Sequence, residues 1–561
     1  MKKVLTSLMA LMLFYLVGFH FGYAANLPSA YKTGSSIMSI EKAFKEGKIS
    51  QGDKLFFKLQ AIIAPRDLPA QFKSAVEEII PCGTPIVMEA LNNWRLLSPD
   101  QQQKATAYLA RPNSDAVYIS PESHFAIHFD TVGYDAVPME DLDFSGMPDY
   151  VERIGLYADS SYQYYHQDLG YLVPPSDGDQ YYDIYLIKIS AYGVTIREYA
   201  GDSSWNDYSS YIQINNTFLD FPPNDDPEGD VIGAQKVTCA HEYYHAAQLA
   251  YDGLEDLWWM ESSATAFEEF TFSAVNDNYN YLPFFYDYPD TSLTANGYHM
   301  YGTFVWTLFL EEKFGQSIIH SIWNHCRFNS SIPAIDSALL PYGKSMETTF
   351  PEFESWNYFT GSRSDTARYD SGAYYPTAPL DRVIPSYPFS PISPVNPPDG
   401  LSCNYIKSYP DTSLNGYLRI DFDGANTVEW AFAYLTFAGA AISFVDNCPM
   451  DFEGRTSCGI YDFLLYDSVV FIPLVVSPWL DDNQYAFGTT FIPFGDANGS
   501  GVVNAQDITY VINFLYKHGP SPVNNYLLGD ADCNGIVNIL DISYLIKFVY
   551  KGGNPPCPYR P

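Results

Sequence analysis

The C-terminal end of the chain contains the feature that restricts the fold most, an internal repeat. The segments GDANGSGVVNAQDITYVINFLYK and GDADCNGIVNILDISYLIKFVYK are the same unit at an offset of 34 residues. In each copy, oxygen-bearing side chains fall at loop positions 1, 3, 5, 9 and 12, glycine takes position 6 and an apolar helix follows, a spacing that predicts one Ca²⁺ per loop. The predicted ligands are Asp496, Asn498, Ser500, Asn504 and Asp507 in the first copy and Asp530, Asp532, Asn534, Asn538 and Asp541 in the second.

This repeat resembles a type I dockerin, whose loop also ends in aspartate at position 12. The resemblance assigns residues 494–561 to a small α-helical, calcium-binding module and implies a cohesin-bearing scaffold as the partner. Without calcium, the clustered carboxylates would repel one another, and a module this small is expected to lose its order.

The N-terminus reads as a secretory signal at residues 1–24. Lys2 and Lys3 form a basic start, an apolar run follows, and a small-x-small site ends at Ala24. The alternative is an N-terminal membrane anchor, but the apolar run is short for a span. No later segment is apolar for long enough to cross a bilayer, so we expect a secreted protein that is extracellular or attached to a cell surface.

Composition narrows the possible partners. A formal net charge of −36 argues against nucleic acid and against anionic membrane surfaces as partners.

The length of 561 residues suggests three or four domains. Eight cysteines are compatible with disulfides outside the cell, and the local pairs Cys448–Cys458 and Cys533–Cys557 are the expected ones.

The chain reads as a multidomain α+β protein. Residues 25–112 form a helical leader that could be a propeptide, and residues 113–370 mix strands and helices. Residues 371–399 are so rich in proline that a linker, or an extended segment laid over a neighbour, is expected. Short alternating runs between turns predict a β-sandwich at 400–492.

The segment HEYYH at 241–245 is a candidate zinc site. His241 and His245 are four residues apart in a proline-free stretch, so on a helix both project from one face and can share one zinc ion. Glu242 lies beside them as a base for the attacking water. The alternative is a buried helix with two hydrogen-bonded histidines.

The third ligand decides between these alternatives. The longer metzincin motif is excluded because Gln248 and Tyr251 stand where it needs glycine and histidine. Glu261, sixteen residues after His245, is the first carboxylate of a second helical stretch and is the predicted third ligand. Glu268 and Glu269 are reserves, and Glu268 could instead orient a histidine from outside the ligand set. Two histidines and one carboxylate leave a position open for water, as in catalytic zinc sites.

HEYYH followed by WWMESSATAFEE is similar to the gluzincins, whose W-x-x-E-x-x-A helix supplies the glutamate ligand. With the upstream segment that ends in DLDFSGMPDYVE, residues 40–490 resemble a group of secreted bacterial proteins assigned as metallopeptidases. The resemblance implies a zincin-like domain at 113–370 and proteolysis as the activity. It also implies an oxyanion donor after the third ligand, for which Tyr301 is the candidate, ahead of Tyr298 and His299; a packing role is the alternative.

Two further segments have candidate ligands. In DLDFSGMPDYVE the loop spacing of the dockerin repeats recurs, which predicts a possible third calcium ion, with a solvated acidic turn as the alternative. Its ligands would be Asp141, Asp143, Ser145, Asp149 and Glu152. The second segment is PCGTP, where Cys82 is similar to the propeptide cysteine of matrix metalloproteinases. A thiolate is a good zinc ligand, but a structural or disulfide role is the favoured interpretation of this cysteine.

These patterns predict a secreted zinc peptidase, most simply an endopeptidase, that cleaves a protein or peptide and is tethered by its dockerin. One alternative is a non-catalytic extracellular binding protein. Another is a dockerin-borne component of a polysaccharide-degrading system, because dockerins often accompany glycoside hydrolases. A glycosidase needs two facing carboxylates, and no sequence pattern among 66 acidic residues shows or excludes such a pair.

Overall fold

The computed structural model describes residues 35–74, 79–414, 416–439, 441–460, 463–522 and 526–557. The predicted signal peptide at 1–24 lies outside these ranges. Within them, no helix combines the length and the hydropathy needed to cross a membrane. The chain divides into two units, residues 1–286 with 295–345 and residues 287–294 with 346–561. The first unit therefore ends earlier than the predicted boundary at 370.

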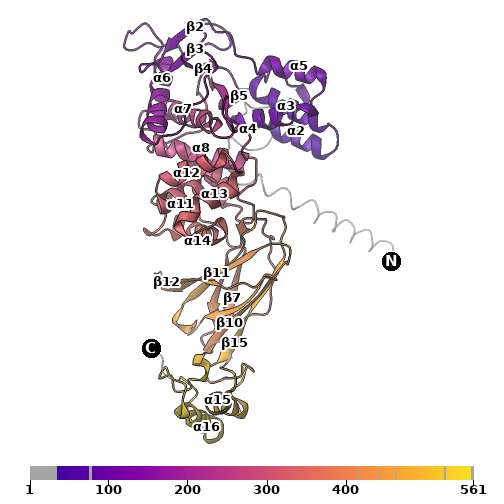
Figure 1. Cartoon of the computed structure of the whole chain (residues 1–561), viewed down its shortest axis with the longest axis vertical. Helices are drawn as coiled ribbons and strands as arrows, with labels where there is room; N and C mark the ends of the chain where they lie inside the picture. The colour runs from indigo at the N-terminus through magenta and orange to yellow at the C-terminus, as the bar shows by residue number, and fades with distance from the viewer. Residues whose placement is uncertain are drawn as a thin grey trace, which may run out of the picture. The chain divides into compact units, whose positions relative to one another are not determined.

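A six-stranded mixed sheet organises unit 1, with strand order β1-β5-β6-β4-β3-β2 (Figure 1). β1 pairs with β5, β6 with β4 and β4 with β3 in parallel, whereas β5–β6 and β3–β2 are antiparallel. The strands are β1 (Ile80–Cys82), β2 (Ala116–Ile119), β3 (Phe125–Phe129), β4 (Tyr182–Ile187), β5 (Ala191–Ala200) and β6 (Tyr208–Asn215).

The side chains of strand β5 alternate between the two faces of the sheet. One face packs against the helices of the N-terminal region and the other against helix α7. Val194 and Ile196 join a hydrophobic core with helices of the N-terminal region. Gly193 and Thr195 instead contact Glu242 of helix α7. The region predicted as a separate leader thus shares a core with the sheet and supplies its edge strand β1. Its helices are α2 (Ser36–Lys45), α3 (Gln51–Ile63), α4 (Thr84–Asn92) and α5 (Pro99–Tyr108).

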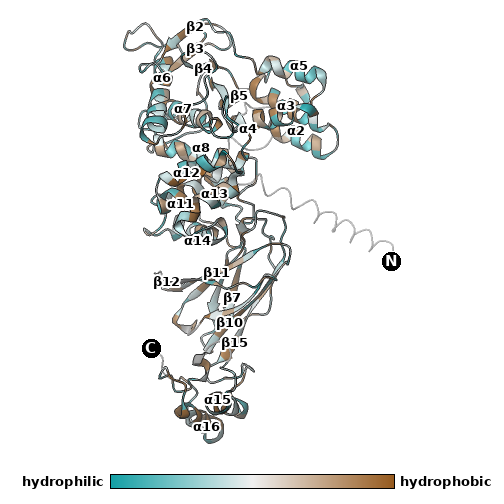
Figure 2. Ribbon diagram, in the orientation of Figure 1, coloured by the Kyte–Doolittle hydropathy of each residue, from teal (hydrophilic) through white to brown (hydrophobic). Residues whose placement is uncertain are grey.

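In this region, the number of residues that each helix buries follows the number of apolar residues in its sequence. α3 is amphipathic, begins at a capping box formed by Ser50 and Asp53, and buries Leu55, Phe56 and Leu59. α5 also begins with a capping box but buries only Ala105 of its ten residues, and it is mostly hydrophilic in Figure 2. The core of this layer is therefore supplied mainly by α3, α4 and the sheet.

Among the other helices of unit 1, α6 lies between β3 and β4 in sequence, and the rest follow β6. α6 packs against β3, α7 packs against β5 and β6, and α8 packs against α7. The helices are α6 (Asp149–Tyr162), α7 (Asp230–Leu249), α8 (Leu257–Thr271), α9 (Leu282–Tyr286), α10 (His299–Gly302), α11 (Phe304–Phe314), α12 (Ser317–Cys326) and α13 (Ser331–Leu339).

Unit 2 begins with helix α14 (Met346–Tyr358) and contains two sheets around one hydrophobic core. One sheet has the order β13-β10-β15 and the other the order β12-β11-β14-β9-β7, with β8 paired to β14. This is the arrangement of a β-sandwich. The strands are β7 (Arg382–Tyr387), β8 (Ser402–Cys403), β9 (Ile406–Pro410), β10 (Gly416–Gly424), β11 (Trp430–Ala438), β12 (Ala441–Cys448), β13 (Arg455–Ile460), β14 (Ser468–Val475) and β15 (Tyr485–Pro493).

Of the two interpretations of residues 371–399, a linker or an extended segment laid over a neighbour, the structure fits the second. Strand β7 lies within it and pairs in parallel with β9 at the edge of the larger sheet. An edge strand tolerates Pro385 because one side of its backbone needs no partner. Both predicted disulfides, Cys448–Cys458 and Cys533–Cys557, are present.

The C-terminal repeat forms two helices, α15 (Ala505–Lys517) and α16 (Ile539–Lys551). Each begins at position 10 of its acidic loop, and Asn504 and Asn538 form equivalent capping boxes with Asp507 and Asp541. Ile508, Val511, Ile542 and Leu545 join a small common core. The module is therefore α-helical, as the repeat predicted.

An ion-pair network joins the N-terminal region to the sheet of unit 1, and we expect it to stabilise that unit. Arg111 pairs with Asp177, Asp183 and Glu198, whose side chains are 6–14% exposed. Arg111→Met would leave three partly buried carboxylates without their cation, at a cost of about 2–3 kcal/mol. Chemical denaturation measures this loss. Lys104→Met, which removes an exposed pair with Asp100, should change stability by less than about 1 kcal/mol, and an equal effect of both variants would contradict the assignment.

Candidate metal centre

Helices α7 and α8 bring the three predicted zinc ligands together. His241 and His245 project from one face of α7, and their Nε2 atoms are 3.1 Å apart. Glu261 of α8 lies against both, with Oε1 3.0 Å from Nε2 of His245 and Oε2 3.3 Å from Nε2 of His241. The tertiary contact between the two helices therefore places a carboxylate at the imidazole pair.

Hydrogen bonds from outside the cluster orient both imidazole rings. Nδ1 of His241 is 2.7 Å from Oε1 of Glu268, and Nδ1 of His245 is 2.7 Å from Oε1 of Gln248. Glu268 thus has the orienting contact considered from the sequence: it holds Nδ1 of His241 and contributes no atom to the ligand cluster. Gln248 was not predicted, although its (i, i+3) spacing from His245 was visible. Its amide nitrogen also donates to the carbonyl of Met260 on α8.

A fourth side chain, Cys82 of β1, completes the cluster. One ligand atom from each of Cys82, His241, His245 and Glu261 lies within 4.8 Å of the others, and all four residues are buried. Sγ of Cys82 is 3.4 Å from Nε2 of His245. The disulfide considered for this cysteine is wrong, because Cys82 is a free thiol in the described part of the chain.

The donor spacing fits a tetrahedral zinc ion. Two nitrogen or oxygen ligands about 2.0–2.1 Å from a tetrahedral zinc are roughly 3.3 Å apart, and a sulfur and a nitrogen roughly 3.6 Å apart. The observed separations are 3.0–3.3 Å among the histidine and glutamate atoms and 3.4 Å for the thiol. Neither oxygen of Glu261 accepts a hydrogen bond within the described residues. A cation among these atoms would compensate the buried carboxylate of Glu261.

The electrostatics of the cluster also favour a cation. Burial would raise the pKa of Glu261, but the neighbouring imidazoles of His245 and His241 outweigh it and bring that pKa to about 2. Burial likewise opposes protonation of His241, yet Cys82, Glu261 and Glu268 raise its pKa well above the usual value. The negative environment that stabilises a proton on this ring would also attract a metal ion.

Glu242 lies beside the cluster on the side of β5. Its Oε2 accepts hydrogen bonds from the hydroxyls of Thr195 (2.7 Å) and Thr84 (3.1 Å), and its Oε1 is buried without a partner in the described residues. Gly193 makes this approach possible, since a Cβ there would lie 2.5 Å from Cγ of Glu242. The candidate base is therefore fixed in position, with one free oxygen.

Among the candidate oxyanion donors, Tyr301 faces the cluster. Its hydroxyl donates to the carbonyl of Cys82 at 3.0 Å. Tyr298 stacks on Phe284, and Nδ1 of His299 contacts the Phe284 carbonyl at 2.9 Å. Tyr301 therefore contacts a residue of the cluster.

The two C-terminal loops have the same internal geometry. In each, the amides at positions 5 and 6 donate to the two oxygens of the aspartate at position 1, as Ser500 and Gly501 do to Asp496. The glycines at position 6 have φ of 90° and 86°, which favours glycine. Asp496, Asp507, Asp530 and Asp541 are all fully buried. Buried carboxylates at this density need a cation.

The 141–152 loop repeats part of this pattern. Ser145 and Gly146 donate to Asp141 as their counterparts do in the C-terminal loops, and Asp141, Asp143 and Asp149 lie together. Glu152 is not in this group, because α6 begins at Asp149, whereas the repeat helices begin after position 9. Calcium binding here stays a prediction. In a separate acidic group of Asp177, Asp179 and Asp183, Arg111 pairs with Asp177 and Asp183.

Comparison with known families supports the C-terminal assignment. Residues 494–550 match the family model of the dockerin type I domain. Such domains bind calcium and dock onto cohesin-bearing scaffolds, as is typical of cellulosome components, so this part of the chain tethers the protein to a scaffold. No curated protein matches the chain.

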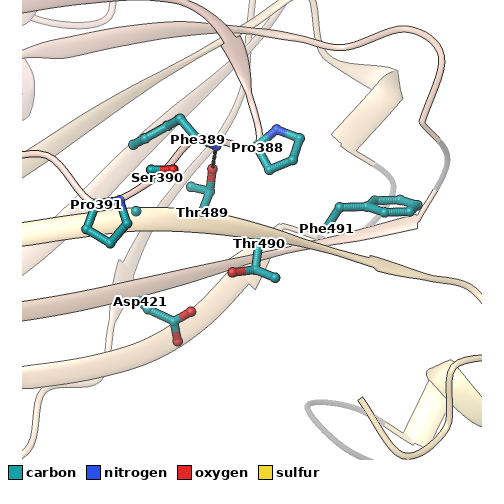
Figure 3. Close-up of a pocket in the computed structure, with 9 residues that line it drawn as sticks. Pro388, Phe389, Ser390, Pro391, Asp421, Thr489, Thr490 and Phe491 are labelled. Carbon is teal, nitrogen blue, oxygen red and sulfur yellow. Dashed lines mark hydrogen bonds between the residues drawn. The ribbon is translucent and has the colours of Figure 1, made fainter. Parts of the chain in front are cut away.

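A pocket of about 410 Å³ lies in unit 2, between the segment after β7 and strand β15 (Figure 3). Phe389, Phe491 and prolines form much of its lining, and Asp421 is the one carboxylate among the lining residues. That carboxylate already pairs with Arg419 and accepts from Ser457. The pocket therefore lacks the two facing carboxylates that glycoside hydrolysis requires.

We expect Glu268 to control metal affinity through His241. Glu268→Leu keeps the approximate volume of the side chain but removes the acceptor for Nδ1, so zinc affinity should fall about 10- to 100-fold. Competition with a chromophoric chelator measures this. The neighbouring Glu269→Leu variant is the matched control and should leave affinity within about twofold. Equal affinity of the Glu268 variant and the wild-type chain would show that this contact does not orient the ligand.

Each C-terminal loop is expected to hold its own calcium ion. Asp496→Ala and Asp530→Ala each remove the position-1 carboxylate, to which two loop amides donate, so each variant should bind one calcium ion fewer than the wild-type chain. Calorimetric titration of the full chain gives the stoichiometry. Asp100→Ala, which changes an exposed aspartate of α5, should leave it unchanged, and unaltered stoichiometry in either loop variant would contradict the ligand assignment.

Proposed function

We propose that this chain is a secreted zinc-dependent peptidase, most simply an endopeptidase, that its dockerin tethers to a cohesin-bearing scaffold. The observation that carries the proposal is the cluster of His241, His245 and Glu261, with Glu242 beside it. The residue types, the ligand spacing and the outer hydrogen bonds together fit a zinc ion. The peptidase resemblance of residues 40–490 supports the same reading.

The residues around the cluster suit peptide hydrolysis. A bound zinc ion would supply Lewis-acid polarisation of a peptide carbonyl and would make water more acidic. Glu242 would take a proton from the attacking water through its free Oε1 and transfer it to the nitrogen of the leaving amine. Tyr301 would donate its hydroxyl hydrogen to the oxygen on which negative charge develops. Thr195 keeps the carboxylate of Glu242 in position.

The alternatives have less support. A glycoside hydrolase would need a facing carboxylate pair, and the pocket of unit 2 offers one engaged carboxylate. A non-catalytic binding protein would need no base, whereas Glu242 is buried with a free oxygen next to the metal ligands. Membership of a polysaccharide-degrading assembly is compatible with the dockerin and does not conflict with peptidase activity.

The test combines metal analysis with casein hydrolysis. We expect one zinc ion per chain and hydrolysis that a chelator abolishes. Since the thiol of Cys82 lies in the cluster, the assay uses both the wild-type chain and Cys82→Ala. Glu242→Gln, placed in the Cys82→Ala chain, should retain zinc and lose at least 100-fold in rate, because the amide cannot accept the proton.

Two results would contradict the proposal. Stoichiometric zinc without hydrolysis in any of these chains would favour the binding protein. Release of reducing sugar from a polysaccharide that persists in Glu242→Gln would favour a glycosidase. Asp207→Asn, at another buried carboxylate of unit 1, is the control and should leave both zinc content and hydrolysis unchanged.

A further inference from the structure

One short segment of the N-terminal region, residues 80–84, contacts every part of the proposed catalytic apparatus. The thiol of Cys82 lies in the ligand cluster, the carbonyl of Cys82 accepts from Tyr301, and the hydroxyl of Thr84 donates to Glu242. With this segment in place, His241, Glu242, His245 and Glu261 are at most 5% exposed. A substrate therefore has no access to them.

We infer that residues 80–84 are a built-in inhibitor, in which Cys82 is the fourth zinc ligand and the segment occupies the place of the substrate. This inference rests on the proposed peptidase function. It extends that function by assigning a fourth ligand, a latent state and the conformation of the substrate that the site accepts.

The thiol of Cys82 would occupy the coordination position that a catalytic zinc ion keeps open for water. A catalytic zinc has three protein ligands and an open place for water, whereas four protein ligands are typical of a closed site. Sγ of Cys82 is 3.4 Å from Nε2 of His245, close to the sulfur–nitrogen spacing around one zinc ion. The ligand-directed oxygens of Glu261, which accept no hydrogen bond within the described residues, independently indicate a cation at this point.

The backbone of the segment has the contacts expected of a bound peptide. The Cys82 carbonyl accepts the Tyr301 hydroxyl at 3.0 Å, as a scissile carbonyl would. The Thr84 hydroxyl donates to Oε2 of Glu242, and the amide of Thr195 donates to the same hydroxyl. The candidate donor and the candidate base are therefore both engaged by the segment.

Strand β1 also occupies the edge of the sheet next to the cluster. Ile80 donates its amide to the carbonyl of Ser190, and Gly83 donates to the carbonyl of Gly193. An exposed strand edge of this kind binds an extended peptide through its backbone. Once β1 is displaced, the edge of β5 would offer these carbonyls to a substrate. The substrate class is thus an extended polypeptide segment that adds to β5 as a strand.

The core explains why the segment stays bound. Ile80 and Val87 are buried with Val194 and Ile196 of β5 and with residues of α3. Gly83 packs closely on Ile62 and Val194, since a Cβ there would lie 2.9 Å from Ile62. Packing and the thiol ligand therefore both hold the segment in place, so the latent state should persist in the intact chain, and loss of the ligand alone should raise the fraction of molecules in which the segment is released.

Cobalt spectroscopy tests the ligand without relying on activity. The full chain loaded with Co²⁺ should show a thiolate-to-cobalt charge-transfer band in the near ultraviolet, and Cys82→Ser should lose it. Cys239→Ser is the matched control, because Cys239 is a buried free thiol of α7 that does not belong to the cluster. A band of equal strength in Cys82→Ser and the wild-type chain would overturn the ligand assignment.

Hydrolysis of casein by the zinc-loaded chains tests inhibition. Cys82→Ala should be at least tenfold faster than the wild-type chain, and Cys82→Ser, which is nearly isosteric, should also be faster if folding is intact by circular dichroism. Equal rates in all three chains would overturn the inhibitor and leave the peptidase standing. Loss of the cobalt band without hydrolysis in any chain would instead reject the peptidase and the inhibitor together, while the thiol ligand would stand.

Discussion

The convergence of two histidines, a glutamate and a thiol in one buried cluster is the constraint on which the candidate site of unit 1 depends. Their ligand atoms lie 3.0–3.4 Å apart, and a cation between them would compensate the buried carboxylate of Glu261. The outer contacts of His241 with Glu268 and of His245 with Gln248 direct both Nε2 atoms inward. The helix pair α7–α8 thus serves both as part of the core and as the frame of the candidate metal centre.

The packing of the N-terminal region on the sheet has two consequences. Its helices complete the hydrophobic core on one face of the sheet, and its strand β1 lies along β5 at the metal cluster. Because these contacts belong to one cooperative layer, the region cannot be regarded as a detached leader. At the other end of the chain, the dockerin type I domain tethers the protein to a scaffold.

Local patterns in the sequence were enough to predict several features of the structure. Position-specific spacing identified the calcium loops, because their ligands come from consecutive residues around one turn. The pairs Cys448–Cys458 and Cys533–Cys557 were likewise predictable from short separations. Proline content predicted the structure of residues 371–399 less well. Pro385 excludes a central strand but is compatible with an edge strand. The pairing of β7 with β9 shows that the segment forms an edge strand.

The sequence by itself determined the two-histidine helix, the candidate base Glu242 and the dockerin repeat, since each depends on spacing along a single element. The tertiary structure decided which distant groups meet them. Glu261 reaches the histidines through the packing of α8 on α7, and Cys82 reaches them from 163 residues away through strand pairing. Such contacts depend on how elements pack, which no local periodicity encodes.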